Sequence, residues 1–316
     1  MGCCPPGPGR PSPERQDGAR SPLTLERDEK ALLDLVTIPA GDFLMGSDGA
    51  DAIVGDGEGP PRRVHLSTYA IAPATVINRE FATFVRATHY VTEAEQEGFS
   101  FVFYLQMPDA ARKRARHVAS GLPWWMPVMH ACWQRPEGSG SHIYDRLDHP
   151  VVHVSWNDAK LYVAWLSRKT GKTYRLLSDS EREYITRAGT TTPFWWGSTI
   201  TPTQANYDAN KVYAGGGQKG VYREKTVPVD SFNANPWGFY NVSGNVWEWV
   251  EDCHESALNG VPADGSPRPA TANCANHTYR GGSHLSDPDS LRSAARLYGG
   301  NDERAGHVGL RVARRL

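Results

Sequence analysis

Residues Val229–Asp252 read VDSFNANPWGFYNVSGNVWEWVED, and this stretch sets the character of the predicted fold. Asn, Gly, Pro and Ser residues that favour turns alternate in it with large aromatic side chains. Trp247 and Trp249 flank Glu248 near its end, and we expect both indoles to lie in the core. Large flat side chains of this kind can build a core where regular elements are scarce. The stretch therefore indicates a loop-rich domain.

Short strands and turns are also predicted nearer the N-terminus. Residues Leu35–Ser47 read LVTIPAGDFLMGS and predict two short strands around the turn Pro39–Gly41. Residues 62–72 read RRVHLSTYAIA, and their alternation of polar and apolar side chains predicts another strand.

Three segments have the apolar spacing of amphipathic helices. The first, Asn78–Thr88, begins with an asparagine that we interpret as its N-cap. The second, Ser155–Gly171, is capped by its serine or by Asn157 and ends near its glycine. The third, Ser178–Gly189, opens with the Ser-x-x-Glu spacing of a capping box. Helices thus occupy a minority of the chain, which favours an α+β class with little regular secondary structure.

Composition limits the classes of partner. The chain has 316 residues, of which 39% are hydrophobic and 22% charged, so it can bury a sizeable core. Its formal net charge of −1 gives no overall field that would attract nucleic acid or an anionic membrane. No stretch approaches the roughly 18 apolar residues of a membrane-spanning helix. We expect neither nucleic acid nor a membrane as partner, and we take a monomer as the default state.

The N-terminal segment and the cysteines indicate organisation and compartment. Residues 1–30 lack apolar periodicity, so we expect a disordered tail ahead of one domain at residues 31–316. The first residues contain no apolar segment typical of a secretory signal. Within the domain, Cys132, Cys253 and Cys274 stand far apart and are odd in number. We expect isolated free thiols and a reducing, cytoplasmic location.

Several words along the chain are specific when they are taken together. Besides residues 229–252 they are IPAGDFLMGS (38–47), TVINREFATFV (75–85), PWWMPVMHACWQRPEG (123–138), RLDHPVVHVSWNDAKLYVAW (146–165), YRGGS (279–283) and VGLRVAR (308–314). In this order and at this spacing they resemble the formylglycine-generating-enzyme family, also called sulfatase-modifying factors, over residues 35–316. The resemblance implies the family's modified C-type-lectin-like fold, which agrees with the loop-rich α+β class.

The resemblance also implies structural Ca²⁺, a hard cation that prefers oxygen ligands. One family site uses an Asn, two carbonyls and a Glu, and the matching positions here are Asn241, Gly244, Val246 and Glu248. A second family site begins at positions that match Asn206 and the Tyr207 carbonyl. No aspartate follows where the acidic ligand of that second site should stand. The alternative for Glu248 is a simple ion pair with an arginine.

One departure from the family bears on activity. Family oxidases place two cysteines after the Gly-Gly-Ser word, and these thiolates bind copper and use O₂ to convert a substrate cysteine to formylglycine. Here the first position matches Ser286, and the second falls near Ser290 or Leu291. Soft Cu(I) needs sulfur ligands, whereas a serine hydroxyl is hard and uncharged at neutral pH. Neither copper as a cofactor nor copper-dependent oxidation is expected.

The loop that replaces the cysteine pair is polar and is a candidate ligand site, with a solvated surface turn as the alternative. The candidate pocket residues are Ser283, His284, Ser286, Asp287, Asp289, Arg292 and His307. Among them, two histidines and two aspartates offer a mixed nitrogen and oxygen set of the kind that binds non-heme iron. The helical iron-binding word H-x₃-H-x-E, which some relatives carry in an additional domain, is absent.

Four other positions are interpreted as structural. Arg296 and Arg311 match family arginines that we expect to bind carboxylates and so hold the domain together. His149 and His153 lie in a strand-like run that contains Pro150, and we expect both imidazoles to have all their hydrogen bonds satisfied.

These observations predict a family member without the copper-binding cysteines. As a pseudoenzyme, it would bind a peptide, a protein or a small polar ligand in the groove. The alternative is an oxidoreductase with altered metal chemistry, such as non-heme iron, that acts on a peptide or a small metabolite. Bound iron with O₂ consumption would favour the enzyme, and calcium alone would favour the binding protein.

Overall fold

The computed structural model describes residues 35–53, 55–107, 124–268 and 274–316. The predicted tail, residues 1–30, lies outside the described residues. Over the described ranges the elements run in the order β1 (Val36–Ile38), β2 (Gly41–Met45), β3 (Arg62–Leu66), β4 (Tyr69–Ile71), α1 (Asn78–Thr88), α2 (Glu93–Glu97), β5 (Phe99–Phe103), η2 (Tyr104–Gln106), β6 (Trp125–Met129), α4 (Trp156–Thr170), β7 (Tyr174–Leu176), α5 (Asp179–Arg187), β8 (Trp247–Cys253), β9 (Asn276–Arg280), η3 (Pro288–Leu291), β10 (Arg296–Gly300), β11 (Val308–Leu310) and β12 (Val312–Arg315). The elements are short and the loops long, as the α+β prediction requires.

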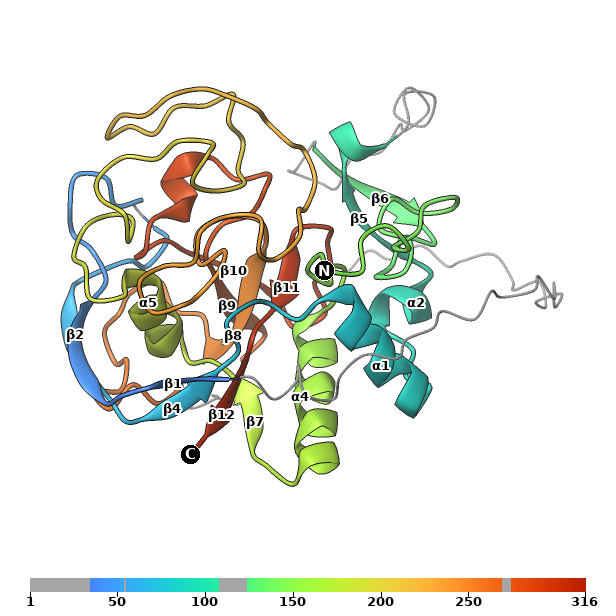
Figure 1. Cartoon of the computed structure of the whole chain (residues 1–316), viewed down its shortest axis with the longest axis horizontal. Coiled ribbons are helices and arrows are strands. Elements are labelled where there is room, and N and C mark those ends of the chain that lie inside the picture. The colour runs from blue at the N-terminus through green and yellow to red at the C-terminus, as the bar shows by residue number, and fades with distance from the viewer. Residues whose placement is uncertain (1–34, 54, 108–123, 269–273) are drawn as a thin grey trace, which may run out of the picture.

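The strands form two four-stranded sheets and two hairpins. One sheet has the order β1-β4-β12-β7, and the other has the order β10-β9-β8-β11. In the second sheet β11 runs parallel to β8, while β8 and β9 are antiparallel, with Glu248 opposite Arg280 and Cys253 opposite His277. The hairpin β5–β6 lies beside α1 and α2 on one side of this sheet, and β2 and α5 lie on the other (Figure 1).

The structure contains the predicted strands, except that the single strand predicted at residues 62–72 is divided into β3 and β4. The turn at Pro39 separates β1 from β2, but the two strands pair with β4 and β3 and not with each other. The alternating stretch at residues 62–72 contains two strands, because pairing is interrupted at Ser67 and Thr68, and β3 pairs with β2 whereas β4 pairs with β1 and β12.

The predicted helices also formed, with one error at a cap. Helix α4 begins after Ser155, whose hydroxyl accepts the Asp158 N–H, and α5 begins after the capping box at Ser178. In α1, however, Asn78 is the first helical residue and Ile77 is the N-cap. The Asn78 side chain instead donates to the Arg146 carbonyl, so a tertiary contact takes the group that we expected to cap the helix.

Aromatic side chains form the largest apolar cluster, as the tryptophan-rich loops indicated. Trp247 and Trp249 are both buried and pack against Tyr279 of β9. Helices α1 and α4 add further rings, with Phe81 stacked 5.7 Å from Tyr162. The cluster fixes the sheet against these helices.

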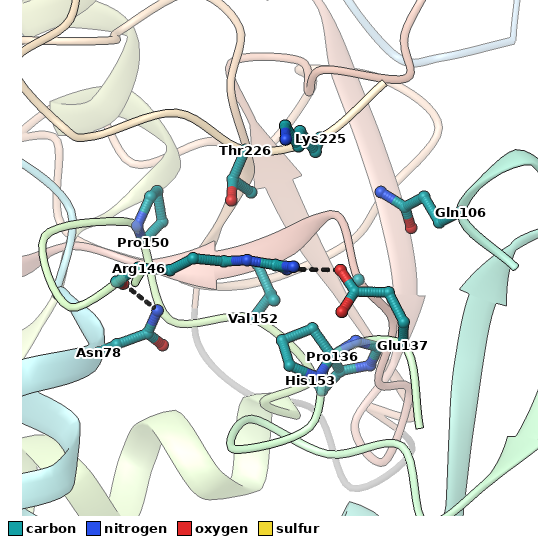
Figure 2. Close-up of a pocket in the computed structure, with 11 residues that line it drawn as sticks. Asn78, Gln106, Pro136, Glu137, Arg146, Pro150, Val152, His153, Lys225 and Thr226 are labelled. Carbon is teal, nitrogen blue, oxygen red and sulfur yellow. Dashed lines mark hydrogen bonds and ion pairs between the residues drawn. The ribbon is translucent and has the colours of Figure 1, made fainter. Parts of the chain in front are cut away.

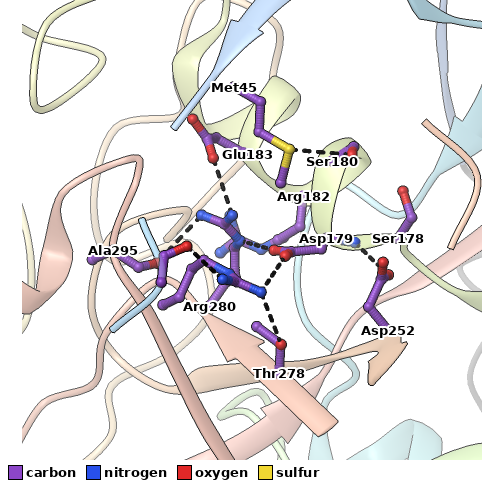
Figure 3. Close-up of polar contacts among 12 residues, drawn as sticks. Met45, Ser178, Asp179, Ser180, Arg182, Glu183, Asp252, Thr278, Arg280 and Ala295 are labelled. Carbon is purple, nitrogen blue, oxygen red and sulfur yellow. Dashed lines mark hydrogen bonds and ion pairs between the residues drawn. The ribbon is translucent and has the colours of Figure 1, made fainter. Parts of the chain in front are cut away.

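A second kind of core is ionic and surrounds α5 (Figure 3). The buried carboxylate of Asp179 binds Arg280 and Arg296, and Arg280 also reaches Glu183 at 3.0 Å. The predicted carboxylate contacts of Arg296 and Arg311 are confirmed, since Arg311 binds Glu248 at 2.9 Å. Removing one partner of such a buried pair leaves an uncompensated charge, so these contacts specify how α5 docks on the sheet.

The cysteine prediction was wrong for two of the three residues. Cys253 at the end of β8 and Cys274 before β9 form a disulfide, whereas Cys132 is a buried free thiol. The strand register brings together sulfurs that lie 21 residues apart in the sequence. The bridge removes the cysteine argument for a reducing compartment, and the cytoplasmic location stays a prediction. Among the described residues, no helix combines the length and hydropathy needed to cross a bilayer.

Candidate ligand-binding site

The loop after β9 carries the Gly-Gly-Ser word and closes on itself through two hydroxyl groups. Gly281 and Gly282 adopt φ values of 103° and 74°, a left-handed conformation that favours glycine and turns the chain out of the strand. The Ser283 N–H then donates to Ser286 Oγ at 3.0 Å, and the two hydroxyl oxygens lie 3.1 Å apart. The first family cysteine position is thus an oxygen in a serine–serine contact.

The second family cysteine position is occupied by apolar packing. Leu291 is completely buried in a cluster with Phe194, Tyr207 and Tyr213. Its neighbour Ser290 uses its N–H to cap the short η3 turn at the Asp287 carbonyl. Neither position offers a sulfur ligand, and the free thiol of Cys132 lies in another part of the fold.

His284 is buried beneath this loop with a defined hydrogen-bonding state. Its Nδ1 lies 2.8 Å from the Asn245 carbonyl oxygen, which can only accept, so Nδ1 carries a proton. Its Nε2 lies 3.1 Å from the amide nitrogen of Gln106, which donates to it. Burial lowers the pKa of His284 to about 4, so the ring is neutral at physiological pH.

His307 and His153 are further buried imidazoles in this region. The His307 ring packs on Trp125 at 4.4 Å, and its Nδ1 has no hydrogen-bond partner in the described residues. Burial, and then the charges that His284 and His153 would carry, lower the pKa of His307 to about 3. The His307 ring is therefore neutral at physiological pH.

His153 departs from its predicted structural role. Its Nδ1 contacts Ser100 Oγ at 2.8 Å, but its Nε2 has no hydrogen-bond partner within the described ranges. Burial lowers the pKa of His153 to about 4. By contrast, His149 contacts Thr226 Oγ1 at 3.0 Å. A fully buried nitrogen without a partner is a candidate contact for a ligand.

The acidic and basic candidates do not join the histidines. Asp287 is exposed and binds Lys211 at 2.7 Å, and Asp289 accepts only a long contact from the Ala214 N–H at 3.5 Å. Arg292 is buried and holds Glu58 with two bonds of 2.6 and 2.7 Å, so it is a structural residue. The proposed iron set of two histidines and two aspartates is not assembled in this arrangement.

The residues matched to the first calcium site are arranged around an ion pair. Each Glu248 oxygen accepts one bond from Arg182 and one from Arg311, at 2.8 to 3.1 Å. Burial alone would raise the pKa of Glu248, but the two guanidinium groups hold it below its usual value. A dication at this carboxylate would have to displace two cations, so the Glu248 set does not fit Ca²⁺ as it stands.

Two other residues that were predicted to bind calcium have side-chain amide oxygens that take part in no hydrogen bond with an arginine. The side-chain oxygens of Asn206 and Asn241 are buried and have no hydrogen-bond partner in the described part of the chain. Calcium binding near these residues therefore stays a prediction from the resemblance. Arg182, which the motifs did not single out, forms an ion pair with Glu248 and so occupies the carboxylate that we expected to bind Ca²⁺.

A pocket near His284 includes Gln106 in its lining, and the Gln106 amide nitrogen lies 3.1 Å from His284 Nε2. Figure 2 shows the residues that line this pocket. Its inner part has a volume of about 20 Å³, enough for one water-sized group, and includes Asn78, His153 and Thr226 in its lining. A second hollow of about 410 Å³, within the range of small-molecule sites, shares Gln106, Glu137, Arg146 and Lys225 with it, and we take this hollow as the outer part of the same cavity. The outer lining consists of Gln106, Glu137, Arg146, Arg223, Glu224 and Lys225.

The rim of this cavity has more positive than negative side chains. Arg146 donates to Glu137 at 2.5 Å across the opening, as Figure 2 shows. Arg223 lies over the Phe232 ring. Lys225 is exposed and forms no ion pair within the described residues. Outside the Arg146–Glu137 pair, Arg223, Glu224 and Lys225 form no ion pair among the described residues, so the rim has one net positive charge, and Lys225 is its exposed cation.

Most of these lining residues were missed by the sequence analysis, although a signal existed. Glu137, Arg146 and His153 lie in two of the words that carry the resemblance, at residues 123–138 and 146–165. Lys225 lies in a loop without any such word, and only the fold places it opposite them. The sequence analysis concentrated on the Ser286 loop, where the family chemistry would lie.

Comparison with known proteins tests the resemblance. The model of the sulfatase-modifying factor enzyme 1-like domain matches residues 21–316. A formylglycine-generating enzyme from Thermomonospora curvata is 39% identical over 294 residues, covering 88% of this chain and 92% of that protein. A Bos taurus protein named inactive C-alpha-formylglycine-generating enzyme 2 is 38% identical over 235 residues, covering 74% of this chain and 75% of that protein.

Solved structures agree on the fold. PvdO from Pseudomonas aeruginosa has a TM-score of 0.67 and 30% identity, covering 89% of this chain and 94% of that chain. The Treponema denticola variable protein 1, at 19% identity and a TM-score of 0.58, shares the fold alone. The predicted α+β, C-type-lectin-like class is confirmed, and the chain belongs to the formylglycine-generating-enzyme, or sulfatase-modifying-factor, family.

Proposed function

We propose that this chain is a binding member of its family, which holds a small polar or peptide ligand in the cavity above His153. The observation that carries the proposal is the combination of a net positive rim with polar atoms at the floor that have no hydrogen-bond partner among the described residues. Lys225 supplies the charge, and the unpaired atoms are Asn78 Oδ1 and His153 Nε2. Buried polar atoms without partners favour a ligand that supplies them.

The chemistry of the lining defines the ligand class. The Asn78 amide nitrogen already donates to the Arg146 carbonyl at 2.8 Å, so its free oxygen can only accept. A ligand would therefore present a hydrogen-bond donor at the floor and an anionic group toward Lys225. A peptide with a free C-terminus, or an amino-acid-like metabolite, has both groups.

The same arrangement argues against the copper chemistry of the family oxidases. A copper–thiolate site requires two sulfur ligands after the Gly-Gly-Ser word, and this chain has Ser286 and the buried Leu291 region there. Without thiolates, Cu(I) has no soft ligand in this loop. The similarity to a protein named inactive C-alpha-formylglycine-generating enzyme 2 is consistent with a role that does not include formylglycine formation.

Calorimetric titration of the full chain with three probes tests the binding proposal. The probes are succinate, a tripeptide with a free C-terminus, and the same tripeptide as its C-terminal amide. We expect the free acid to bind at least about tenfold more tightly than the amide, because a charged hydrogen bond contributes roughly 1.5–3 kcal/mol. Lys225→Met should remove this difference.

The matched control is Lys172→Met, which changes an exposed lysine in the turn after α4. It should leave all three affinities unchanged. Equal affinity for the acid and the amide, or equal loss in both variants, would show that the rim cation does not recognise the ligand and would refute the proposal.

A second candidate, an oxidoreductase with altered metal chemistry, is favoured by the unpaired imidazole nitrogens of His153 and His307. Imidazole is a ligand for Fe(II). His153 lines the inner part of the cavity, and His307 lies close enough that a charge on His153 would lower its pKa. Anaerobic titration with Fe(II), followed by exposure to O₂, tests it. Tight binding that is lost in His153→Asn and His307→Asn, together with O₂ consumption, would favour this candidate over a binding protein.

A further inference from the structure

The disulfide between Cys253 and Cys274 lies next to a histidine that has one free nitrogen. Cys253 is the last residue of β8, and the register places His277 of β9 opposite it. The Cα atoms of the two cysteines are 5.7 Å apart, and His277 Nε2 lies 3.5 Å from Cys274 Sγ. The two sulfur atoms and a histidine nitrogen lie within 4.8 Å of one another.

The neighbours of His277 fix which nitrogen is free. The Asn301 amide donates to the Cys274 carbonyl at 3.1 Å, so its other atom, Oδ1, accepts from His277 Nδ1 at 2.7 Å. Nδ1 therefore carries the proton, and the Nε2 lone pair faces the sulfurs. The ring is buried and stacks on Trp156 with centroids 3.7 Å apart. A hydrogen bond from the other ring nitrogen is the usual way in which a metal-binding imidazole is held in position.

We propose that Cys253, Cys274 and His277 bind one soft or borderline d¹⁰ cation, Zn²⁺ or Cu(I), when the disulfide is reduced. Two thiolates and one imidazole form a set that both ions accept, with a fourth position open to solvent or substrate. The disulfide is then the metal-free state of the same site. This site is independent of the proposed ligand-binding function.

Opening the site requires a two-electron reductant, and a dithiol is the class that balances the step. The dithiol gives two electrons and two protons to the Cys253–Cys274 bond, passes through a mixed disulfide with one of the cysteines, and leaves as a cyclic disulfide. The S–S bond breaks and two thiols form. On metal binding each thiol loses its proton to solvent, and two metal–sulfur bonds replace the two S–H bonds.

Geometry and access allow this exchange. With Zn–S of about 2.3 Å and Zn–N of about 2.1 Å, a tetrahedral ion holds its ligand atoms roughly 3.5–4 Å apart. The present sulfur-to-nitrogen distance of 3.5 Å already meets this spacing, and the freed sulfurs need only move apart. Cys274 is partly exposed, so a reductant and an ion can reach it, while Cys253 and His277 are buried beneath it.

Metal titration of the full chain in two redox states tests the proposal without any mutation. One sample is reduced with a dithiol and freed of it under nitrogen, and the other is left oxidised. We expect the reduced chain to bind one Zn²⁺ by calorimetry and to compete for Cu(I) against a coloured chelator. With Co²⁺ it should show a sulfur-to-metal charge-transfer band. The oxidised chain should do none of these.

Variants then assign the ligands. Cys274→Ser should weaken Zn²⁺ binding by more than about 100-fold, since changes outside the ligand shell alone cost 10–100-fold. Asn301→Ala, which alters only the positioning of His277, should weaken binding by about tenfold and keep the Co²⁺ charge-transfer band. Cys132→Ser is the matched control and should leave affinity unchanged.

Two outcomes would overturn the proposal. If the reduced chain binds no Zn²⁺, Cu(I) or Co²⁺ above the level of the oxidised chain, the cysteines form a structural bridge only. If Cys274→Ser and Cys132→Ser bind Zn²⁺ equally, the ion is held elsewhere. Near-ultraviolet circular dichroism of each sample shows whether the fold has survived.

Discussion

The two ends of the β8–β9 strand pair carry opposite chemistry. Beyond Arg280 the chain enters the Ser283–Ser286 loop, where the family places sulfur and this chain has two hydroxyl oxygens. At the other end, Cys253 and Cys274 lie beside an imidazole. Cys253 stands five positions after Glu248, or about 17 Å along the strand at roughly 3.4 Å per residue.

This difference shows that a motif without cysteines does not mean that the chain lacks a pair of sulfur atoms elsewhere. A reading of the Gly-Gly-Ser word finds that both thiols are missing and predicts a protein without a thiolate site. The strand register brings two cysteines that are distant in sequence together at a position about which the Gly-Gly-Ser motif carries no information. The predictions below test each end and the ionic core between them.

The largest expected effect concerns the Ser286 end. A cysteine-containing sulfatase peptide, incubated with the full chain, Cu(I) and O₂, should yield no formylglycine by mass spectrometry. The reason is that no sulfur ligand follows the Gly-Gly-Ser word. Ser286→Cys alone should not restore the product, because buried Leu291 fills the neighbourhood of the second position.

A functional enzyme of the family, assayed in parallel, is the positive control. Aldehyde formation by the wild-type chain would contradict the argument at this end. Aldehyde that disappears in Cys274→Ser would instead place the copper chemistry at the other end of the strand pair.

The second effect lies between the two ends, at Glu248. Glu248→Ala should lower the free energy of unfolding by about 3–5 kcal/mol, because Arg182 and Arg311 would remain buried without their carboxylate. Urea unfolding measures the change. If Glu248 acts through this ion pair, the cost should be the same with and without a calcium chelator.

The matched control removes a surface pair. Asp148→Ala breaks the exposed contact with Arg79 and should cost less than about 1 kcal/mol. If a chelator destabilises the wild-type chain by as much as Glu248→Ala does, and the variant no longer responds to it, calcium and not the ion pair occupies this carboxylate.

The elements that sequence analysis predicted well are those specified locally. Ser155 caps α4 and Ser178 opens the capping box of α5, and each signal lies within one helical turn. The cap of α1 was misplaced because Asn78 makes a tertiary contact with the Arg146 carbonyl. Local patterns cannot register competition from a partner that is distant in sequence.

The candidate site, more than the helices, is formed by residues that are distant from one another in the sequence. The motifs predict that Ser286 stands in the position of a family cysteine, and this match stays a prediction from the resemblance. They could not predict that Arg182 of α5 would form an ion pair with Glu248. Nor could they predict that Lys225 and Arg146 would line the same cavity. The contact of Cys253 with Cys274 depends on the register of β8 and β9, which no short word encodes.

The third effect concerns the sulfur end. Reduction of the Cys253–Cys274 bond should lower the free energy of unfolding by about 3 kcal/mol, the value expected for a closed loop of this length. Zn²⁺ added to the reduced chain should restore part of this loss, because an ion that binds only the folded state stabilises it. Urea unfolding of the oxidised, reduced and Zn²⁺-treated chain measures both changes.

Cys132→Ser is the control for this experiment, since the Cys132 thiol takes no part in the bridge. It should respond to reduction and to Zn²⁺ as the wild type does. Stability that is unaffected by reduction would show that the bridge does not constrain the chain, and a reduced chain that ignores Zn²⁺ would contradict the metal site.

The smallest effect returns to the Ser286 end, where buried neutral imidazoles make the fold sensitive to acid. The folded pKa of His153 is about 4, below its ordinary value near 6.5, so the unfolded chain binds more protons between these values. Stability is therefore complete above pH 6.5 and is lost as the pH falls toward 4. By pH 5 the contribution of His153 should have fallen by about 2 kcal/mol.

His153→Gln keeps a polar side chain but cannot titrate, so its stability should fall by about 2 kcal/mol less than that of the wild type between pH 7.5 and pH 5. His65→Gln changes an exposed histidine and should follow the wild-type profile. Urea unfolding at each pH gives both values. Parallel profiles for wild type and His153→Gln would mean that His153 has the same pKa in the folded and the unfolded chain, which would contradict its burial as a neutral ring. A wild-type stability that rises relative to the variant as the pH falls would mean that the folded ring is held protonated. In that case a cation, and not a neutral acceptor, would form the floor of the cavity, and the ligand expected above it would have to present an acceptor in place of a donor.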